Sequence, residues 1–228
     1  MTRHLAENAR RVLAIELDAS LARQPAQDFR EKPGVEIIPA DVLKVDLAAL
    51  CRRAGTARAL VFGNLPYYIT SPLLHHLYAQ RQSIRSMGLL MQREVAERLT
   101  ARPGTRDYGY LTIATQMAAQ PQIALAVPPG AFSPAPRVQS ALVTFHMKAM
   151  FEAWPRQKRE DFLEFVKRCF ARKRKNLPNN LAGFYPRPRL LAALEAADQT
   201  PGARAEELSV AQLAALFELL SGSHAGPR

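Results

Sequence analysis

Residues 62–72, with the sequence FGNLPYYITSP, place an asparagine, a proline and two tyrosines directly after a run of apolar residues. The side-chain carbonyl of Asn64 and the backbone carbonyls of Leu65 and Pro66 are hydrogen-bond acceptors that could converge on one point. Such a cluster suits an amino group on an aromatic ring, whose delocalised lone pair makes it a poor nucleophile. Accepting the hydrogens of that group stabilises the positive charge that grows as the nitrogen attacks an electrophile.

The first tyrosine extends this interpretation to a nucleobase. Tyr67 could stack on the face of the base, a contact of ~1–3 kcal/mol. A base within a duplex would first have to be flipped out. The alternative is a strand-to-helix turn with tyrosines in the core, and the four residues Asn-Leu-Pro-Tyr alone do not decide between the two.

Acidic residues follow two earlier apolar segments. Glu16 is the second-last residue of the segment 11–17, and Asp41 ends the segment 35–41. A carboxylate at the carboxyl end of a strand can accept hydrogen bonds from both hydroxyls of a ribose, and a second one from the exocyclic amine of the same nucleoside. The alternative for Asp41, and for Asp18, is an ordinary helix N-cap.

The pattern of apolar segments predicts the elements that would position these residues. Short apolar strands alternate with helix-like segments, which is typical of a parallel α/β sheet. Ser71 and Pro72 are expected to cap and begin the helix after the Asn64 segment, and the helix that follows Glu16 is expected to stop at its proline. A proline-rich loop between two further strands predicts an antiparallel hairpin at the sheet edge. The expected strands cover 11–17, 35–41, 57–63 and 86–92, with the hairpin in 122–147.

The character of the sequence changes near residue 150. The spacing of apolar residues predicts amphipathic helices over 158–176, 189–197 and 209–220, the last capped by Ser209. We therefore expect a main domain over 1–150 and a small all-helical domain over 151–228.

Composition restricts the class of protein. The chain has 228 residues with 31 Lys and Arg against 20 Asp and Glu, a formal net charge of +11 that suits a polyanionic partner such as nucleic acid. No stretch approaches the roughly 18 apolar residues that span a bilayer. The two cysteines have no metal-ligand spacing, so we expect no metal and a reducing, cytoplasmic location.

Several further segments complete a resemblance to a known family. NLPYYITSPLL resembles the catalytic motif of the S-adenosylmethionine-dependent adenine N6-methyltransferases of ribosomal RNA, and the other segments follow in that family's order up to about residue 220. The similarity is closer to the small-subunit dimethyltransferases of the kasugamycin-resistance type than to the large-subunit enzymes. The other matching segments are VLAIELD, ADVL, LMQREVAERL, YGYLTIATQ, VPPGAFSPAPRVQSALV, RKRKNLPNNL and RAEELSVAQLAAL.

This resemblance implies a Rossmann-like methyltransferase sheet, S-adenosylmethionine as cofactor, and the small ribosomal subunit precursor as the partner of a monomeric enzyme. Glu16 would hold the cofactor ribose, Asp41 the adenine amine, and Val42 would pack on the adenine ring. The motif residues Asn64, Leu65, Pro66 and Tyr67 would form the catalytic site, with Asn64 also counted among the cofactor-binding residues. Tyr67 and Phe132 would stack on opposite faces of the target adenine; the alternative for Phe132 is a loop aromatic that packs into the core.

A basic cluster near the helical end fits an RNA partner. Its residues are expected on one extended helix, where they would contact RNA phosphates and set affinity rather than sequence preference. The alternative is a solvated helix face near a C-terminus, where cations are favourable in any case. The cluster consists of Arg168, Arg172, Lys173, Arg174 and Lys175.

One departure from the family concerns the cofactor. The family has a glycine-rich loop about 20 residues before the ribose acid, and no such loop precedes Glu16 in this sequence. We therefore expect the first strand of the sheet to be missing and methyltransferase activity of the 228 residues by themselves to be weak or lacking. A start codon further upstream, a fragment of a longer protein, and a divergent protein that has lost cofactor binding are the three explanations. A ribosome-assembly factor that binds RNA without catalysis stays an alternative, as does a large-subunit enzyme and, more remotely, a DNA adenine methyltransferase.

Overall fold

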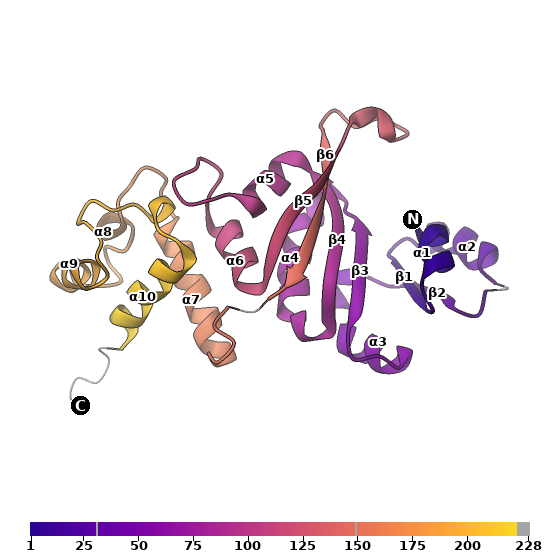
Figure 1. Ribbon diagram of the computed structural model, residues 1–228, viewed down its shortest axis with the longest axis horizontal. Coiled ribbons are helices and arrows are strands. Elements are labelled where there is room, and N and C mark those ends of the chain that lie inside the picture. Colours follow the sequence, from indigo (N-terminus) through magenta and orange to yellow (C-terminus); the bar gives the residue numbers. More distant parts are fainter. Residues whose placement is uncertain (31, 149, 223–228) are drawn as a thin grey trace. The chain divides into compact units, whose positions relative to one another are not determined.

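The computed structural model describes residues 1–30, 32–148 and 150–222 (Figure 1). Contacts divide the chain into two compact units. The N-terminal unit comprises residues 1–60 and 68–85, and the C-terminal unit comprises residues 61–67 and the chain from 86 onward. This division does not follow the boundary expected at residue 150, which stays a prediction.

The N-terminal unit contains a two-stranded parallel sheet. Its strands β1 and β2 pair from Val12 with Val35 to Glu16 with Pro39. Helix α2 continues through Pro25, so the expectation that it stops at this proline is wrong. The elements of this unit are α1 (Thr2–Asn8), β1 (Val12–Glu16), α2 (Ala19–Asp28), β2 (Val35–Pro39), α3 (Leu47–Ala54) and α4 (Thr70–Ala79).

Helix α4 begins two residues earlier than its sequence suggests. It starts at Thr70 after a 3₁₀ turn over Tyr67–Ile69, and the residue at the N-cap, Ile69, supplies no side-chain hydrogen bond. Ser71 therefore lies inside the helix rather than at its cap. The 3₁₀ turn already sets the direction of the helix, so a side-chain cap is not required.

A second, mixed sheet lies mostly in the C-terminal unit. Its strands have the order β3-β4-β6-β5, and β6 runs antiparallel to both β4 and β5. The predicted hairpin is thereby confirmed, with β5 at the edge. Helices α5 and α6 contact β5. The elements are β3 (Ala59–Asn64), β4 (Ile84–Gln92), α5 (Arg93–Thr100), α6 (Tyr110–Ala118), β5 (Ala119–Val127) and β6 (Ser140–Met147).

The α/β class with a helical C-terminal region is confirmed, whereas the sheet is not continuous. Among the described residues, β1 and β3 belong to different sheets, and no described strand pairs with both of them. The alternation of strands and helices therefore gives the correct elements.

Four helices at the end of the chain bury a common apolar core. The core extends onto α6 through Ile113 and Met117, which explains why these helices do not separate as a unit of their own. The predicted cap at Ser209 is confirmed, because its hydroxyl accepts the Gln212 amide at 3.3 Å. The helices are α7 (Arg156–Cys169), α8 (Leu177–Asn180), α9 (Arg187–Ala196) and α10 (Val210–Ser221).

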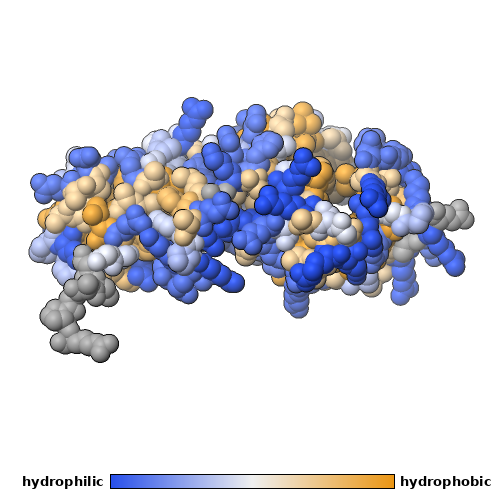
Figure 2. Space-filling view, turned by 60° about the horizontal axis from the view of Figure 1, so that its bottom comes forward, coloured by the Kyte–Doolittle hydropathy of each residue, from blue (hydrophilic) through white to orange (hydrophobic). Residues whose placement is uncertain are grey.

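The surface is consistent with the high charge of the chain. Hydrophilic residues cover much of the face in view in Figure 2, with smaller apolar areas between them. Of the described helices, none combines the length and the apolar character that crossing a bilayer requires.

Candidate functional site

The segment after β3 forms one wall of a pocket in the C-terminal unit. Leu65 is buried, and its amide donates to the carbonyl of Leu90 in β4 at 3.0 Å, which fixes the chain where the strand ends. The pocket has a volume of about 310 Å³, near the lower end of the ~300–1,000 Å³ that small-molecule sites occupy. It is lined by Asn64, Leu65, Pro66, Phe132, Pro134 and Pro136.

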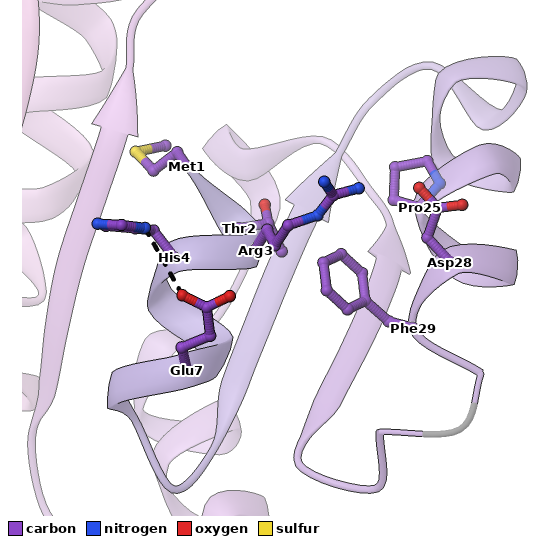
Figure 3. A pocket seen from close by; sticks show the side chains of 8 residues that line it. All are labelled: Met1, Thr2, Arg3, His4, Glu7, Pro25, Asp28 and Phe29. Atoms are coloured by element: carbon purple, nitrogen blue, oxygen red, sulfur yellow. Dashed lines mark ion pairs between the residues drawn. The ribbon is translucent and has the colours of Figure 1, made fainter.

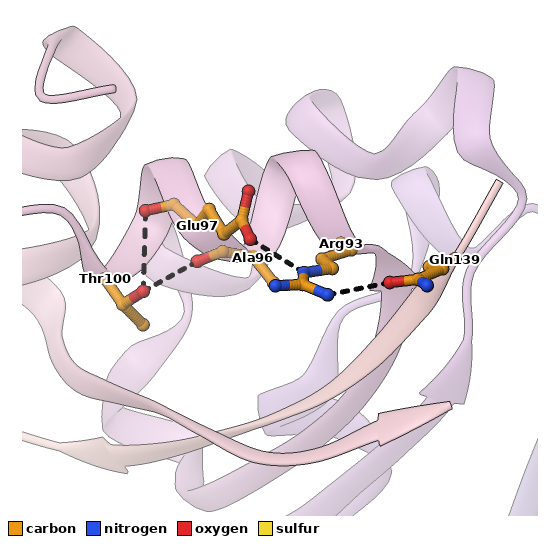
Figure 4. Close-up of polar contacts among 5 residues, drawn as sticks. All are labelled: Arg93, Ala96, Glu97, Thr100 and Gln139. Atoms are coloured by element: carbon orange, nitrogen blue, oxygen red, sulfur yellow. Dashed lines mark hydrogen bonds and ion pairs between the residues drawn. The ribbon is translucent and has the colours of Figure 1, made fainter. Parts of the chain in front are cut away.

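The opposite wall belongs to the proline-rich loop between β5 and β6. Phe132 follows a 3₁₀ turn and donates its amide to the carbonyl of Pro129 at 3.1 Å. Figure 4 shows that Arg93, at the start of α5, bonds Gln139, the residue directly before β6. The Arg93 side chain donates to the side chain of Gln139 at 2.7 Å and to Glu97 at 2.8 Å, and its amide donates to the Gln139 carbonyl at 2.9 Å. These bonds hold the base of the loop that carries Phe132.

Asn64 and Phe132, far apart in the sequence, therefore line the same pocket. Within the described part of the chain, no group hydrogen-bonds the Asn64 side chain, so its amide is available to a ligand. The side chain of Tyr67 lies outside the part of the chain that the structure describes, so its stacking on the target base stays a prediction. Arg93 was missed at the sequence level because its partner Gln139 lies 46 residues away.

The two predicted cofactor acids lie at the carboxyl ends of neighbouring parallel strands in the N-terminal unit. Glu16 is the last residue of β1, and its backbone carbonyl accepts the amide of Ala40, one residue before Asp41. Asp41 also caps the 3₁₀ turn Val42–Lys44 by accepting the Leu43 amide at 3.0 Å. The cap interpretation of Asp41 therefore holds alongside any binding role.

Asp18 is a helix cap. Its carboxylate accepts the hydroxyl and the amide of Ser20 and the amide of Leu21, at the start of α2. The hydrogen bond from the Ser20 hydroxyl is the main cause that lowers the pKa of Asp18. Glu16 accepts the Asp18 amide at 3.0 Å through one oxygen.

The hydrogen-bond acceptors of Glu16 and Asp41 fit the hydroxyl and amine groups of a nucleoside. A carboxylate has about four lone-pair positions, and a backbone amide occupies one of those on each acid. The ammonium of Lys44 also lies 4.0 Å from the second oxygen of Asp41. Both acids therefore retain acceptor capacity for hydroxyl or amine hydrogens, and half-buried Val42 can supply an apolar contact beside Asp41.

A larger hollow of about 530 Å³ lies beside α1 and the end of α2 in the same unit. Figure 3 shows charged and apolar side chains around it, with an ion pair between His4 and Glu7 at 3.7 Å. Neither Glu16 nor Asp41 lines it. Because both members of the ion pair are more than half exposed, water competes with any ligand there.

The basic cluster does not lie on one helix, so that part of the expectation is wrong. Helix α7 ends at Cys169, and Arg172–Lys175 form a turn in which Arg174 has a φ of +67°. The buried side chain of Asn180 holds this turn. It accepts the Arg172 amide at 3.2 Å and donates to the carbonyls of Cys169 at 2.7 Å, Arg172 at 3.2 Å and Lys175 at 3.3 Å.

Arg168 remains on α7 and has partners of its own. Its side chain donates to Glu164 at 3.4 Å, and its guanidinium lies 4.2 Å from the ring centre of Phe184. The cluster thus consists of one partly engaged arginine and an exposed basic turn, whose phosphate-binding role stays a prediction.

Carboxylates at the ends of adjacent strands can hold a nucleoside, and the acceptors beside Asn64 can hold an aromatic amine, as the resemblance to S-adenosylmethionine-dependent adenine methyltransferases implies. The family described as ribosomal RNA adenine dimethylase matches residues 1–221, so the chain belongs to this family. The predicted family, enzyme class and cofactor are confirmed.

Curated relatives and solved structures agree with this assignment. Proteins named ribosomal RNA small subunit methyltransferase A from Acidobacterium capsulatum and Desulfitobacterium hafniense are each 42% identical, covering 96% of this chain and 77% of their own length. The crystal structure of the 23S rRNA methyltransferase ErmE has a TM-score of 0.70 and 28% identity, covering 96% of this chain and 86% of its own. A dimethyladenosine transferase from Plasmodium falciparum, at a TM-score of 0.79 and 22% identity, shares the fold over 97% of this chain and 87% of its own.

Proposed function

We propose that this protein transfers two methyl groups from S-adenosylmethionine to N6 of adenines in small-subunit ribosomal RNA. The observation that carries the proposal is the single pocket that Asn64 and its neighbours share with Phe132. Relatives named for the small subunit are 36–42% identical to this chain, whereas the large-subunit enzyme ErmE is 28% identical. This difference favours the small-subunit substrate.

In this proposal the pocket residues make the exocyclic amine of adenine reactive. The Asn64 side-chain carbonyl and the backbone carbonyls of Leu65 and Pro66 accept the amine hydrogens. Each acceptor stabilises the positive charge that develops on N6 as its lone pair forms the new bond, so the interaction is stronger in the transition state than in the ground state. The amine attacks in its neutral form and releases a proton afterwards, so no general base is needed before the attack.

Phe132 would pack on the face of the adenine, which must be unstacked to enter the pocket. When bound, the cofactor supplies a methyl group activated by a sulfonium. Glu16 and Asp41 would hold its nucleoside portion, and Val42 would pack beside the adenine. These roles follow from the chemistry of each group within its own unit.

The basic turn Arg172–Lys175 would contact RNA phosphates, an electrostatic contribution that sets affinity. A cytoplasmic location and a monomeric state belong to the same proposal. The ribosomal substrate is supported by the names of the relatives.

The variant Asn64→Ala tests the assignment of the pocket. We expect methyl transfer to fall about a hundredfold or more, because a transition-state acceptor is lost, while RNA affinity changes little. The measurement is single-turnover transfer of labelled methyl with protein in excess over RNA, which detects slow reactions, together with an RNA-binding titration. Asn179→Ala, which truncates an exposed asparagine of α8, is the matched control.

The result that contradicts the proposal is loss of RNA binding in Asn64→Ala with unchanged transfer to the RNA that remains bound. RNA binding by the unmodified chain without any methyl transfer would instead favour the assembly-factor alternative.

A further inference from the structure

Phe184 presents a large aromatic ring to solvent at a fixed position. The residue is 52% exposed and lies between α8 and α9. The turn that carries it is well defined: the carbonyl of Leu181 accepts the Phe184 amide at 3.1 Å, and Gly183 adopts a φ of +91°, which favours glycine. A rigid exposed ring loses little conformational entropy when a ligand stacks on it.

The Phe184 ring is already part of a stacked pair. The guanidinium of Arg168 lies 4.2 Å from the ring centre, and its Nε donates to Glu164 at 3.4 Å. A guanidinium over an aromatic ring is a cation–π contact that fixes both groups. More than half of the phenylalanine surface nevertheless stays exposed, so the pair leaves room for a further flat, electron-rich ring.

The basic turn lies directly beside this pair in the chain and is bonded to the same short helix. The Arg172 side chain donates to the carbonyl of Asn179 at 3.4 Å, and Asn180 bonds the backbone of the turn. Helix α8 leads from these asparagines into the turn that carries Phe184. Positive charge and an exposed ring are therefore held on one local framework, which is how single-stranded nucleic acids are bound without sequence preference.

We infer that Phe184, stacked with Arg168, is a binding site for an unpaired nucleobase of the RNA whose phosphates contact the basic turn Arg172–Lys175. The inference rests on the proposed function, because it assumes an RNA ligand. It adds a second base-binding position: neither Phe184 nor Arg168 lines the Asn64 pocket. The charge around the ring favours RNA over an apolar protein partner.

Fluorescence of the variant Phe184→Trp provides a direct test. The probe is a single-stranded oligoadenylate of about ten nucleotides, compared with a blunt-ended RNA duplex. We expect the introduced indole to be quenched by the single-stranded probe and much less by the duplex. Leu125→Trp, at an exposed position on β5, is the matched control and should show no quenching. The native Trp154 packs against Phe151 at 4.4 Å and supplies the background signal, which the unmodified chain measures.

Affinity variants separate stacking from general apolar contact. Phe184→Ala and Phe184→Leu should each weaken binding of the single-stranded probe about tenfold, while Phe184→Tyr should retain it. Circular dichroism of each variant verifies the fold. Equal affinity in Phe184→Leu and the unmodified chain, or an unquenched indole while RNA binds, would overturn this inference and leave the proposed function intact. A chain that binds neither RNA probe would overturn both.

Discussion

Glu16 and Asp18 lie two residues apart, yet their carboxylates have different hydrogen-bond partners. Asp18 accepts the hydroxyl and amide of Ser20 at 2.5 and 2.7 Å, and its lowered pKa reflects those bonds. Glu16 accepts the backbone amide of Asp18. The carboxylate of Asp18 therefore stabilises the start of α2, while Glu16 retains acceptor capacity beyond the strand.

This difference predicts the effect of removing each charge. Glu16→Gln should weaken S-adenosylmethionine binding about tenfold, because hydrogen bonds to an ionised acceptor are the stronger kind. Asp18→Asn should leave the affinity unchanged, since asparagine caps a helix as well as aspartate does. Calorimetric titration of both variants measures the change. Equal affinity in Glu16→Gln and the unmodified chain would remove Glu16 from the cofactor site.

Hydrogen bonds between residues close together in the sequence could be predicted, and those between distant residues could not. The cap at Ser209 depends on Gln212 three residues later, so its signature is visible in the sequence. The function of Asn180 depends on carbonyls that converge only because α7 ends at Cys169. The one sign of this function in the sequence is that Asn180 lies between Leu177 and Leu181, on the side of the helix that the spacing places in the core.

At the scale of elements, the end of α7 is the point at which sequence periodicity gave the wrong answer. The basic residues after Cys169 are good helix formers, so their spacing alone predicts a continuing helix. Asn180 competes with that continuation by bonding the carbonyls that a further helical turn would use. Tertiary hydrogen bonds therefore override local propensity and present the basic side chains from a turn.

Asn180→Ala should consequently destabilise the helical core. Removing this side chain takes its donor from the buried carbonyl of Cys169 and from the part-buried carbonyl of Lys175, and we expect the free energy of unfolding to fall by ~2–3 kcal/mol. Urea denaturation monitored by circular dichroism measures the loss. The neighbouring Asn179→Ala truncates an exposed side chain and should stay within ~0.5 kcal/mol of the unmodified chain. A similar small effect in both variants would show that water satisfies the carbonyls.

The turn itself predicts a dependence on salt. Replacing Arg172 and Lys175 by glutamine should weaken RNA binding and reduce the slope of log affinity against log salt by roughly one unit for each lost phosphate contact. Replacement of Lys32 and Arg52, exposed cations of the N-terminal unit, is the control for net charge. An unchanged slope in the turn variant would assign these residues to an ordinary solvated surface.

At the scale of the whole molecule, apolar burial is distributed unevenly. In β1 only Val12 is buried, and β2 is half-buried at best. The core around α6, α7 and α10 instead contains side chains with no exposed surface, among them Phe162, Leu213 and Leu216. Since the described β1 and β3 lie in different sheets, the β1–β2 pair lacks the lateral support of the larger sheet.

Hydrogen exchange should reveal this difference and test cofactor binding together. We expect the amides of β1 and β2 to exchange through openings of low free energy, well before those of α7 and α10.

Saturating S-adenosylmethionine should slow exchange in β1 and β2, because Glu16 and Asp41 lie at the ends of these strands and binding stabilises the closed form. At a hundredfold excess over the dissociation constant the stabilisation is ~2.7 kcal/mol. Mass spectrometry of peptides from both regions, with Glu16→Gln as the control, measures it. Uniform protection of the two regions would contradict the first expectation, and cofactor protection that persists in Glu16→Gln would contradict the second.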